Sequence, residues 1–546
     1  MQYQNPVIPG FHPDPSVCRV GEDYYLVNSS FSWFPGIPIF HSRDLVNWRK
    51  IGHVLDRPEQ LPLRDPNHVL MDGILAPTIR YHQGKFYCVT TNAGHHGSIL
   101  VSADDPAGPW SDPIIFDHPG LDNSLFFDDD GQVYYHWCWP GHPGGQIVQV
   151  LIDPVTGKFL SEPRSISPGI GAGGAEGPHL YKINGWYYLL IAEGGTHLGH
   201  LLSIQRSRSP WGPFEPSPHG PFLTHRHTEM TQVIKALGHG ELIEDHNSNW
   251  WVFALGFRTT GWICFASHVL GRETFLAPVT WGDDGWPVVN GGKDLELEMQ
   301  GPLPDSHPWP EQPICEKFDS PELGFDWAFR RNPMPGSWSL TEKPGSLILH
   351  GGAAGLSNPD RNVVIGRRQQ HLFVEVAAEF EFNPPSTNEE AGLSAFMDEH
   401  YFSAVGLRGT PSGGREAFLR RRVGACLEVD VATAPLQPGP VILRIHAERR
   451  WYSFGFEQDG NTTWLGWAET HHHSTEIAWG WTGVLFCLHA SGNGHNATAP
   501  AQVNWFDYHP AADQNFTPDM PDRFDLVPPG EPCNSSVNSA HELPRT

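Results

Sequence analysis

The sequence predicts an all-β protein in which an N-terminal five-bladed β-propeller is followed by a β-sandwich. Helical periodicity is scarce, whereas short aromatic and β-branched runs bounded by Gly, Asp, Asn and Pro recur along the chain. A turn followed by an aromatic strand appears five times: GEDYYLV from 21, GKFYCVTT from 84, GQVYYHW from 131, NGWYYLLIA from 184 and NSNWWVFAL from 247. This repeat of roughly 50 to 60 residues matches the length of one four-stranded propeller blade.

The length of 546 residues is too great for one ordinary core, so more than one domain is expected. We assign residues 1–300 to the propeller, and the Pro-rich segment GPLPDSHPWPEQPI predicts a stiff linker over 301–315. Short strands such as SLILHG and VILRIHAE predict a β-sandwich over 316–510. The tail 511–546 is rich in Pro, Ser, Asn and Asp, and is expected to wrap the surface or to be disordered.

Composition narrows the class of partner. The chain has 61 acidic and 35 basic residues, a net charge of -26 that repels nucleic acid and anionic membranes and favours a neutral substrate. The eight cysteines stand singly without zinc-type spacing, and are expected to be mostly free thiols. The N-terminus lacks a basic start followed by an apolar run, so a cytoplasmic protein is expected.

Four ionisable residues stand at matched places in the repeat. Asp14, Glu176 and His239 each lie eleven residues before the aromatic of their unit, and Asp122 lies twelve before; in the second unit Ala76 takes this place. If the blades are equivalent, these side chains converge on one funnel at the propeller axis. The alternative is that acidic residues at strand starts only bond nearby backbone N–H groups. Because three acidic residues stand at matched offsets, this alternative is the weaker interpretation.

Three converging carboxylates suit the hydrolysis of a glycosidic bond. That reaction needs a protonated acid for the leaving oxygen and a carboxylate on the opposite side of the anomeric carbon. A third carboxylate can raise the pKa of the acid by repulsion between like charges. A propeller that only binds sugar is the alternative from another class, although binding alone needs no pair of acid and base.

Motifs along almost the whole chain resemble those of glycoside hydrolase family 43, in the order found in that family. The resemblance lies in these segments: NPVIPGFHPDPSVCRVGEDYYLVNSSFSWFPG (5–36), SRDLVNW (42–48), APTIRYHQGKFY (76–87), LDNSLFFDDDG (121–131), AEGPHLYKINGWYYLL (175–190), AEGGT (192–196), GHGELI (238–243) and GRETFLAPVTWGDDGWP (271–287). Further segments resemble the concanavalin A-like C-terminal domain of the β-xylosidase group: GRRQQHLFVEVAAEFEF (366–382), EEAGLSAFMDEHYFSAVGL (389–407) and WTGVLFCLHA (481–490).

The resemblance implies an inverting enzyme and a role for each carboxylate. Asp14 is expected to be the general base, Glu176 the general acid, and Asp122 the residue that tunes and orients that acid. Arg272 is expected to bond the sugar and the base, since a guanidinium keeps a carboxylate ionised. His239 is expected to contact waters or a bound ion, or else to be a core histidine.

Aromatic and apolar positions complete the expected sugar pocket. The resemblance implies that Phe31 and Trp33 wall the pocket, and that Trp481 of the second domain closes its rim where the family usually has Phe. Leu75 stands where β-xylosidases commonly carry Trp, which leaves the choice between xylose and arabinose open. A closed rim would make the enzyme exo-acting.

The expected activity is therefore release of terminal β-1,4-xylose or α-L-arabinofuranose from xylan-derived oligosaccharides. An arabinan-degrading hydrolase on the same propeller is the alternative within enzymes. No cofactor is required by this chemistry, and the family pattern allows calcium near His239. The expected partner is a xylo- or arabinoxylo-oligosaccharide, and a homo-oligomer is a further expectation from relatives.

Overall fold

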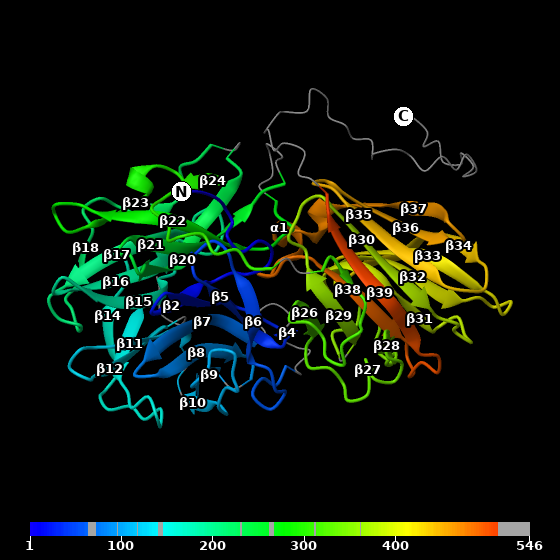
Figure 1. Ribbon diagram of the computed structural model, residues 1–546, viewed down its shortest axis with the longest axis horizontal. Coiled ribbons are helices and arrows are strands. Elements are labelled where there is room, and N and C mark those ends of the chain that lie inside the picture. Colours follow the sequence, from blue (N-terminus) through cyan, green and yellow to red (C-terminus); the bar gives the residue numbers. More distant parts are fainter. Residues whose placement is uncertain are drawn as a thin grey trace.

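The computed structural model describes residues 1–63, 73–95, 97–116, 118, 120–139, 146–229, 232–260, 267–310, 313–360 and 362–511. Two all-β bodies lie side by side, with the N-terminal half on the left and the C-terminal half on the right (Figure 1). The helical segments in the described ranges are short: η1 (Asn290–Gly292), η2 (Thr470–His473) and α1 (Thr475–Ala478). No helix in these ranges has the length and apolar character needed to span a bilayer.

Five antiparallel sheets form the blades of the propeller, as the repeat predicts. Blades one to three contain β2 (Ser16–Val20), β3 (Asp23–Val27), β5 (Gly36–Ser42) and β6 (Arg49–Leu55); β7 (Gly73–His82), β8 (Lys85–Ala93), β9 (Gly97–Ala103) and β10 (Ile114–Phe116); and β11 (Leu121–Phe127), β12 (Val133–Cys138), β13 (Ile147–Leu151) and β14 (Arg164–Ser167). Blades four and five contain β15 (Glu176–Ile183), β16 (Trp186–Glu193), β17 (Leu201–Ser207), β18 (Glu215–Pro216) and β19 (Leu223–Thr224); and β20 (Ile234–Glu244), β21 (Trp250–Arg258), β22 (Glu273–Trp281) and β23 (Pro287–Val289).

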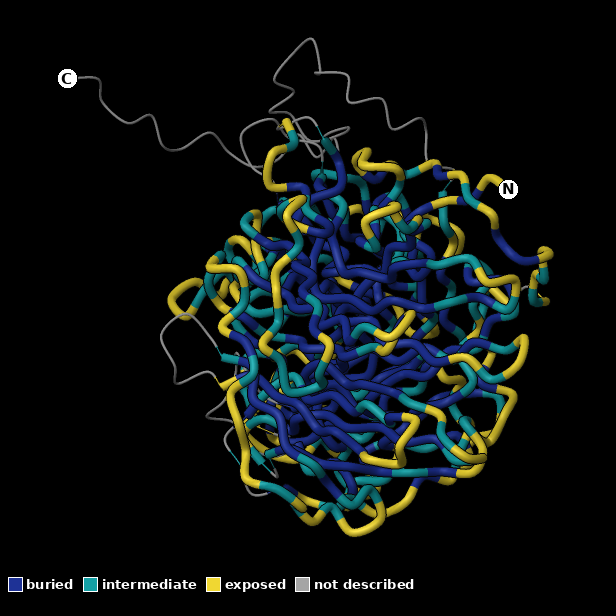
Figure 2. Tube along the Cα trace, turned by 90° about the vertical axis from the view of Figure 1, so that its left-hand side faces the viewer, coloured by how far each residue is buried: buried dark blue, intermediate teal, exposed yellow. Residues whose placement is uncertain are grey.

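The chain start joins the end of the propeller. Strand β1 (Gln2–Gln4) pairs antiparallel with β24 (Glu298–Gln300), and Ile8 bridges Thr274 beside blade five. The strands are buried and the turns between them are exposed (Figure 2). Because the aromatic strands are packed on both faces, β21 (WWVFALGFR) is a nearly continuous apolar run rather than an alternating one.

A buried polar network joins the inner strands of four blades. Glu241 of blade five accepts bonds from Ser16 Oγ (2.5 Å) and the Val17 N–H (2.9 Å) of blade one, and its Oε1 lies 2.5 Å from Nη2 of Arg80 in blade two. The same Arg80 nitrogen lies 3.0 Å from Nδ1 of His179 in blade four. A buried carboxylate tied to three blades fixes the inner strands relative to one another, and loss of one partner of such a pair typically costs about 3–5 kcal/mol.

The C-terminal body is a β-sandwich, as predicted. One sheet runs β27 (Trp338–Ser339), β28 (Leu347–Leu349), β39 (Ala501–Pro510), β30 (Val374–Glu381), β35 (Val441–Ala447), β36 (Trp451–Gln458) and β37 (Asn461–Glu469), with β25 (Cys315–Glu316) beside β39. The other runs β34 (Leu427–Leu436), β33 (Arg415–Val423), β32 (Tyr401–Gly409), β31 (Glu390–Asp398), β38 (Leu485–Ser491), β29 (Val363–Arg368), β26 (Trp327–Arg330) and β4 (Trp33–Phe34).

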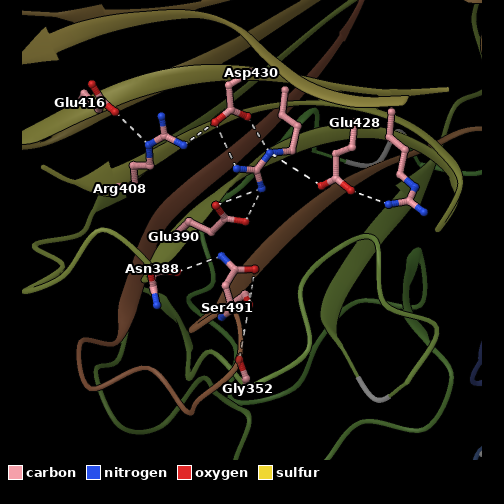
Figure 3. A network of polar contacts seen from close by, with 11 residues as sticks. Gly352, Asn388, Glu390, Arg408, Glu416, Glu428, Asp430 and Ser491 are labelled. Atoms are coloured by element: carbon pink, nitrogen blue, oxygen red, sulfur yellow. Dashed lines mark hydrogen bonds and ion pairs between the residues drawn. The ribbon is translucent and has the colours of Figure 1, made fainter. Parts of the chain in front are cut away.

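Alternation along the sandwich strands places one face in the core. In β35 the side chains of Val441, Leu443 and Ile445 are buried and the intervening residues are half-buried. Cross-strand charge pairs run along strands β31 to β34, including Arg408 with Glu416 at 2.9 Å (Figure 3). This ladder stabilises the sheet on the side of the sandwich that lies away from the propeller (Figure 1).

The two bodies share a sheet, which the sequence did not reveal. Strand β4 comes from a loop of blade one, yet Phe34 and Trp33 pair with Phe329 and Arg330 of β26 at the edge of the sandwich. The segment between the bodies also packs closely, because Trp309 lies under the guanidinium of Arg49 at 3.9 Å. The predicted stiff connector is therefore laid along blade one rather than projecting from it.

The six described cysteines are free, as expected: Cys18, Cys88, Cys138, Cys315, Cys426 and Cys487. The predicted tail lies outside the described residues except for residue 511.

Candidate active site

The same backbone irregularity recurs at or beside the matched positions of the repeat. Asp14 and Asp122 both have φ 52°, His239 has φ 30°, and Ala76 has φ 33°, all in the left-handed region that non-glycine residues seldom adopt. In blade four Gly177 takes this conformation with φ 54°, one residue after Glu176. Because a bulge redirects side chains out of the strand ladder, these irregularities turn the matched positions toward the axis.

The strand pairing shifts register at these positions in four blades. The shifts fall between Leu75 and Thr78, Leu121 and Ser124, Glu176 and His179, and Gly238 and Gly240. Such irregularities cost about 1–3 kcal/mol each and persist where the surrounding structure enforces them. Their repetition around the propeller is the structural basis of the matched offsets found in the sequence.

Asp14 is buried among polar groups of blades one and five. Ser29 Oγ donates to its Oδ2 at 2.6 Å, while Arg272 Nη1 and His239 Nδ1 lie 3.8 and 3.7 Å from its Oδ1. Ser29 Oγ in turn accepts the N–H of Ala76 at 2.7 Å, which ties the loop of blade one to blade two. This setting holds the carboxylate in one orientation next to positive charge.

Glu176 and Asp122 lie close together, and burial raises the pKa of both. Removal from water raises the pKa of Glu176 well above its usual range, and the negative charges of Asp122 and Asp14 raise it further against the opposing charge of Arg272. Burial also raises the pKa of Asp122, although His239 and the Gly177 N–H act to lower it. Glu176 therefore holds a proton at a pH where an exposed glutamate is ionised.

Arg272 joins the two bodies at the funnel. Its buried guanidinium donates from Nη1 to Thr196 Oγ1 at 2.7 Å and from Nη2 to the main-chain carbonyl of Trp481 at 3.1 Å. The side chain is held between the loop after β16 and a loop of the sandwich. Its Nη1 also lies 3.8 Å from Oδ1 of Asp14, which is within ion-pair range but longer than a hydrogen bond.

Two aromatic rings stand beside this guanidinium. Phe31 and Trp481 have ring centroids 5.8 Å apart, and the guanidinium carbon of Arg272 lies 5.7 and 6.0 Å from them. Phe31 also stacks on Phe11 at 5.7 Å, which fixes its ring from behind. The structure thus brings Phe31 from the propeller and Trp481 from the sandwich together at the carboxylates.

Leu75 and Trp33 both lie in the apolar cluster that contains Phe31. Leu75 belongs to the same apolar cluster as Phe31 and Trp481 and is nearly inaccessible. Trp33 is 1% exposed, lies in β4, and packs edge-on against Phe396 of the sandwich at 6.1 Å. Its strand pairing places Trp33 where the two bodies meet, and a role for it in walling the sugar pocket stays a prediction.

Sequence analysis did not single out three residues of this site. Ser29 positions Asp14, Thr196 positions Arg272, and Gly177 makes room for His239, since a Cβ at Gly177 would lie 2.7 Å from His239 Nε2. Thr196 ends the AEGGT motif, and Ser29 follows the first aromatic strand. Their positions in these sequence patterns could therefore have pointed to both residues.

Asp122, Glu176 and His239 have ligand atoms within 4.8 Å of one another, so they could hold a cation. Calcium prefers six to eight oxygen ligands, whereas this set offers two carboxylates and one imidazole. A calcium ion here would need water or substrate oxygens to complete its shell.

Comparison with known proteins agrees with this geometry. Residues 3–287 match the family described as glycosyl hydrolases family 43, and residues 315–509 match the β-xylosidase C-terminal concanavalin A-like domain. A protein of Bacteroides ovatus named non-reducing end α-L-arabinofuranosidase BoGH43B is 44% identical over 514 residues, covering 93% of this chain and 94% of that protein. A xylosidase/arabinosidase of Butyrivibrio fibrisolvens is 35% identical, covering 92% of this chain and 98% of its own.

The solved structure described as Bacteroides ovatus xyloglucan PUL GH43B superposes with a TM-score of 0.89 at 42% identity, covering 94% of this chain and all of that one. A propeller funnel with three acids, closed on one side by a concanavalin A-like domain, defines a glycosidase. The chain belongs to glycoside hydrolase family 43.

Proposed function

We propose that this enzyme releases terminal pentose from the non-reducing ends of xylan-derived oligosaccharides with inversion at the anomeric carbon. The observation that carries the proposal is the meeting of Asp14, Glu176 and Asp122 at one end of the propeller, with Arg272 beside Asp14. The two relatives described above carry the names of enzymes that act on arabinofuranosides or xylosides.

In the proposed reaction Asp14 acts as the base. It takes a proton from water, whose oxygen attacks the anomeric carbon on the face opposite the leaving group. Arg272 Nη1 lies 3.8 Å from Oδ1 of Asp14, so a positive charge stands beside the carboxylate that takes the proton. Ser29 orients the other carboxylate oxygen by its bond of 2.6 Å.

Glu176 acts as the acid in the same step. Its raised pKa keeps it protonated, and the proton passes to the glycosidic oxygen as the bond to the anomeric carbon breaks. Asp122 supports this role through its charge, and its position is set by the Gly177 N–H. After the reaction the proton from water resides on Asp14, and exchange with solvent restores both groups.

Exo action follows from the second body. Trp481 and its loop lie against Phe31 and Arg272 on one side of the funnel. A polysaccharide that extended beyond the pocket in both directions would therefore meet the sandwich. Neither proton transfer requires a metal or other cofactor; calcium, if bound, would be held by Asp122, Glu176 and His239.

We propose arabinofuranose as the first sugar to test and xylopyranose as the second. Leu75 leaves the pocket without the Trp that β-xylosidases commonly carry, and the Bacteroides ovatus relative is named an arabinofuranosidase. The test is release of p-nitrophenol from the α-L-arabinofuranoside and the β-D-xylopyranoside, with the first anomer followed by NMR. Inverted product supports the proposal, and a retained anomer or inactivity on both substrates would contradict it.

A further inference from the structure

A buried guanidinium without a partner lies where the propeller meets the sandwich. Arg368 is the last residue of β29 and is only 4% exposed. Its Nε, Nη1 and Nη2 have no hydrogen-bond partner in the described ranges of the chain. Because a buried charge without a counter-charge is strongly destabilising, buried cations in proteins are normally paired. Arg368 therefore needs an acceptor that the described side chains do not supply.

The surroundings of Arg368 carry an excess of positive charge. Lys50 of β6 lies on the side of the propeller that faces the sandwich (Figure 1), and its Nζ lies 2.9 Å from Oδ1 of Asp326. Nη2 of Arg367 lies 3.5 Å from the other oxygen of this carboxylate. The charge of Asp326 also acts on Arg368, so one carboxylate serves three cations. Burial lowers the pKa of Lys50, and the charges of Arg368 and Arg367 oppose the effect of Asp326.

Aromatic contacts connect the cations of the two bodies. The guanidinium carbon of Arg368 lies 5.3 Å from the ring centroid of Phe11. The next residue, His12, packs edge-on against Phe40 with ring centroids 5.2 Å apart. Nζ of Lys50 lies 5.5 Å from the centroid of the same Phe40 ring. The Phe11–His12 segment and Phe40 therefore connect Arg368 of the sandwich with Lys50 of the propeller.

Two histidines beside these cations also have buried nitrogens without a partner. Nε2 of His12 and Nε2 of His53 are buried and have no hydrogen-bond partner in the part of the chain that the structure describes. Burial lowers the pKa of both rings well below the usual range, and the charges of Arg368 and Lys50 lower it further. Nδ1 of His12 lies 3.1 Å from a main-chain carbonyl and donates to it, so the neutral His12 ring has no proton on Nε2. The neutral His53 ring can carry its proton on Nε2 and donate it.

His53 lies next to Lys50 although the two are three residues apart in β6. The pairing of β5 with β6 shifts by one residue between Lys50 and Gly52. One extra residue in a strand brings side chains three positions apart to the same face. Both side chains also contact Phe325, since Nζ of Lys50 lies 3.3 Å from its carbonyl oxygen and the His53 ring lies 6.3 Å from its ring.

A cleft between the two bodies gives this group of cations access to solvent. The cleft has a volume of about 1270 Å³, and Lys50, Arg367, Asp326 and Phe40 are among the residues that line it. The unpartnered nitrogens of Arg368 lie deeper, because this residue is almost fully buried. A small ion can reach Lys50 from the cleft, whereas an oligosaccharide or a peptide is too large for the enclosed space beside Arg368.

We propose that Arg368, together with Lys50 and His53, binds chloride between the propeller and the sandwich. A guanidinium offers five N–H donors in a planar fork, and hydrogen bonds from a charged donor to an anion are strong. A single negative charge would pair Arg368 and offset the excess of positive charge around it. Because Lys50 and Arg368 come from different bodies, the anion would also stabilise the contact between them. This inference does not rest on the proposed function, since no step of the proposed reaction uses these residues.

The first test is the Tm of the full chain as sodium chloride replaces sodium isethionate at constant ionic strength. Isethionate has the same charge as chloride but is too large for an enclosed site. A ligand that binds only the folded protein raises Tm with its concentration, and we expect a rise of about 2 °C or more for the wild type.

Arg368→Met separates an anion site from an ordinary structural arginine. In isethionate this variant should be at least as stable as the wild type, because it removes a buried charge that has no partner. In chloride it should be the less stable of the two, because it no longer gains from the anion. A structural arginine would instead lower Tm equally in both salts when replaced. Arg444→Met, which breaks the pair of Arg444 with Glu457 in the sandwich, is the control and should keep the full response to chloride.

The position of the anion is tested separately with bromide, which replaces chloride and is located by its anomalous scattering in crystals of the wild type. We expect a bromide ion within hydrogen-bonding distance of Arg368. This measurement decides the question even if Arg368→Met does not fold. A Tm that responds equally to chloride in the wild type and Arg368→Met, a wild type without a response, or crystals without bromide at Arg368 would overturn the inference.

Discussion

Nη1 of Arg272 lies 3.8 Å from Oδ1 of Asp14, while Nη2 of the same guanidinium donates to the carbonyl of Trp481 in the other body. One side chain thus connects the proposed base to the loop that closes the funnel. Arg272 therefore links the position of the sandwich loop to the electrostatic surroundings of the base.

Replacement of Arg272 tests this connection. Arg272→Met removes the positive charge and both hydrogen bonds, and we expect kcat/KM to fall about 10²-fold or more. Arg272→Lys keeps the charge but cannot reproduce both bonds, so its loss should be smaller. Arg422→Met, in the charge ladder of the sandwich, is the control and should retain activity. Similar activity in the Arg272→Met enzyme and the wild type would contradict the coupling.

Asp122 should set the alkaline limit of activity. Its negative charge raises the pKa of Glu176, so Asp122→Asn lowers that pKa. Glu176 then loses its proton at a lower pH, and the alkaline limb of kcat/KM moves toward acid. The measurement is the pH profile on an oligosaccharide, with Asp130→Asn at an exposed turn as control. A limb that stays in place or moves to higher pH would exclude this role for Asp122.

Glu176 should matter most where the leaving group needs a proton. Glu176→Gln is expected to reduce kcat/KM on a xylo-oligosaccharide by about 10²- to 10⁴-fold. The loss on a dinitrophenyl pentoside should be much smaller, because that leaving group departs without protonation. Rates on both substrates decide the question, and equal losses would remove Glu176 from the role of acid.

Gly177 should tolerate no side chain. A Cβ there would lie 2.7 Å from Nε2 of His239, and φ of 54° disfavours other residues. We expect Gly177→Ala to lower both Tm and activity. Gly131→Ala is the matched control, since its φ is also positive but nothing lies within 4 Å, so only Tm should fall slightly. Full activity in Gly177→Ala would show that the contact with His239 is not needed.

Much of the fold could be predicted because a propeller repeats. The five aromatic strands and the matched offsets of Asp14, Asp122, Glu176 and His239 are local patterns, and equivalent blades turn equal offsets into a common axis. The placement of Arg272 and Trp481 came only from motif resemblance, since no periodicity links a propeller loop with a distant sandwich loop.

Other features depend on long-range pairing that no local pattern records. The motif resemblance predicts Trp33 as a pocket aromatic. Its pairing with Arg330 of β26 places it where the propeller and the sandwich meet, which no local pattern records. Glu241 resembles any strand carboxylate until the ring closes and brings Ser16 and Arg80 to it. Thr196 and Ser29 act through hydrogen bonds to Arg272 and Asp14, and such bonds are determined by the folded geometry.

The most direct test of the central claim is turnover by the Asp14→Asn protein on the α-L-arabinofuranoside and the β-D-xylopyranoside, measured beside the wild type. The account predicts that the wild type cleaves at least one substrate and that the variant loses at least about 10³-fold while its Tm and sugar binding survive. A folded Asp14→Asn protein with activity near that of the wild type would contradict it.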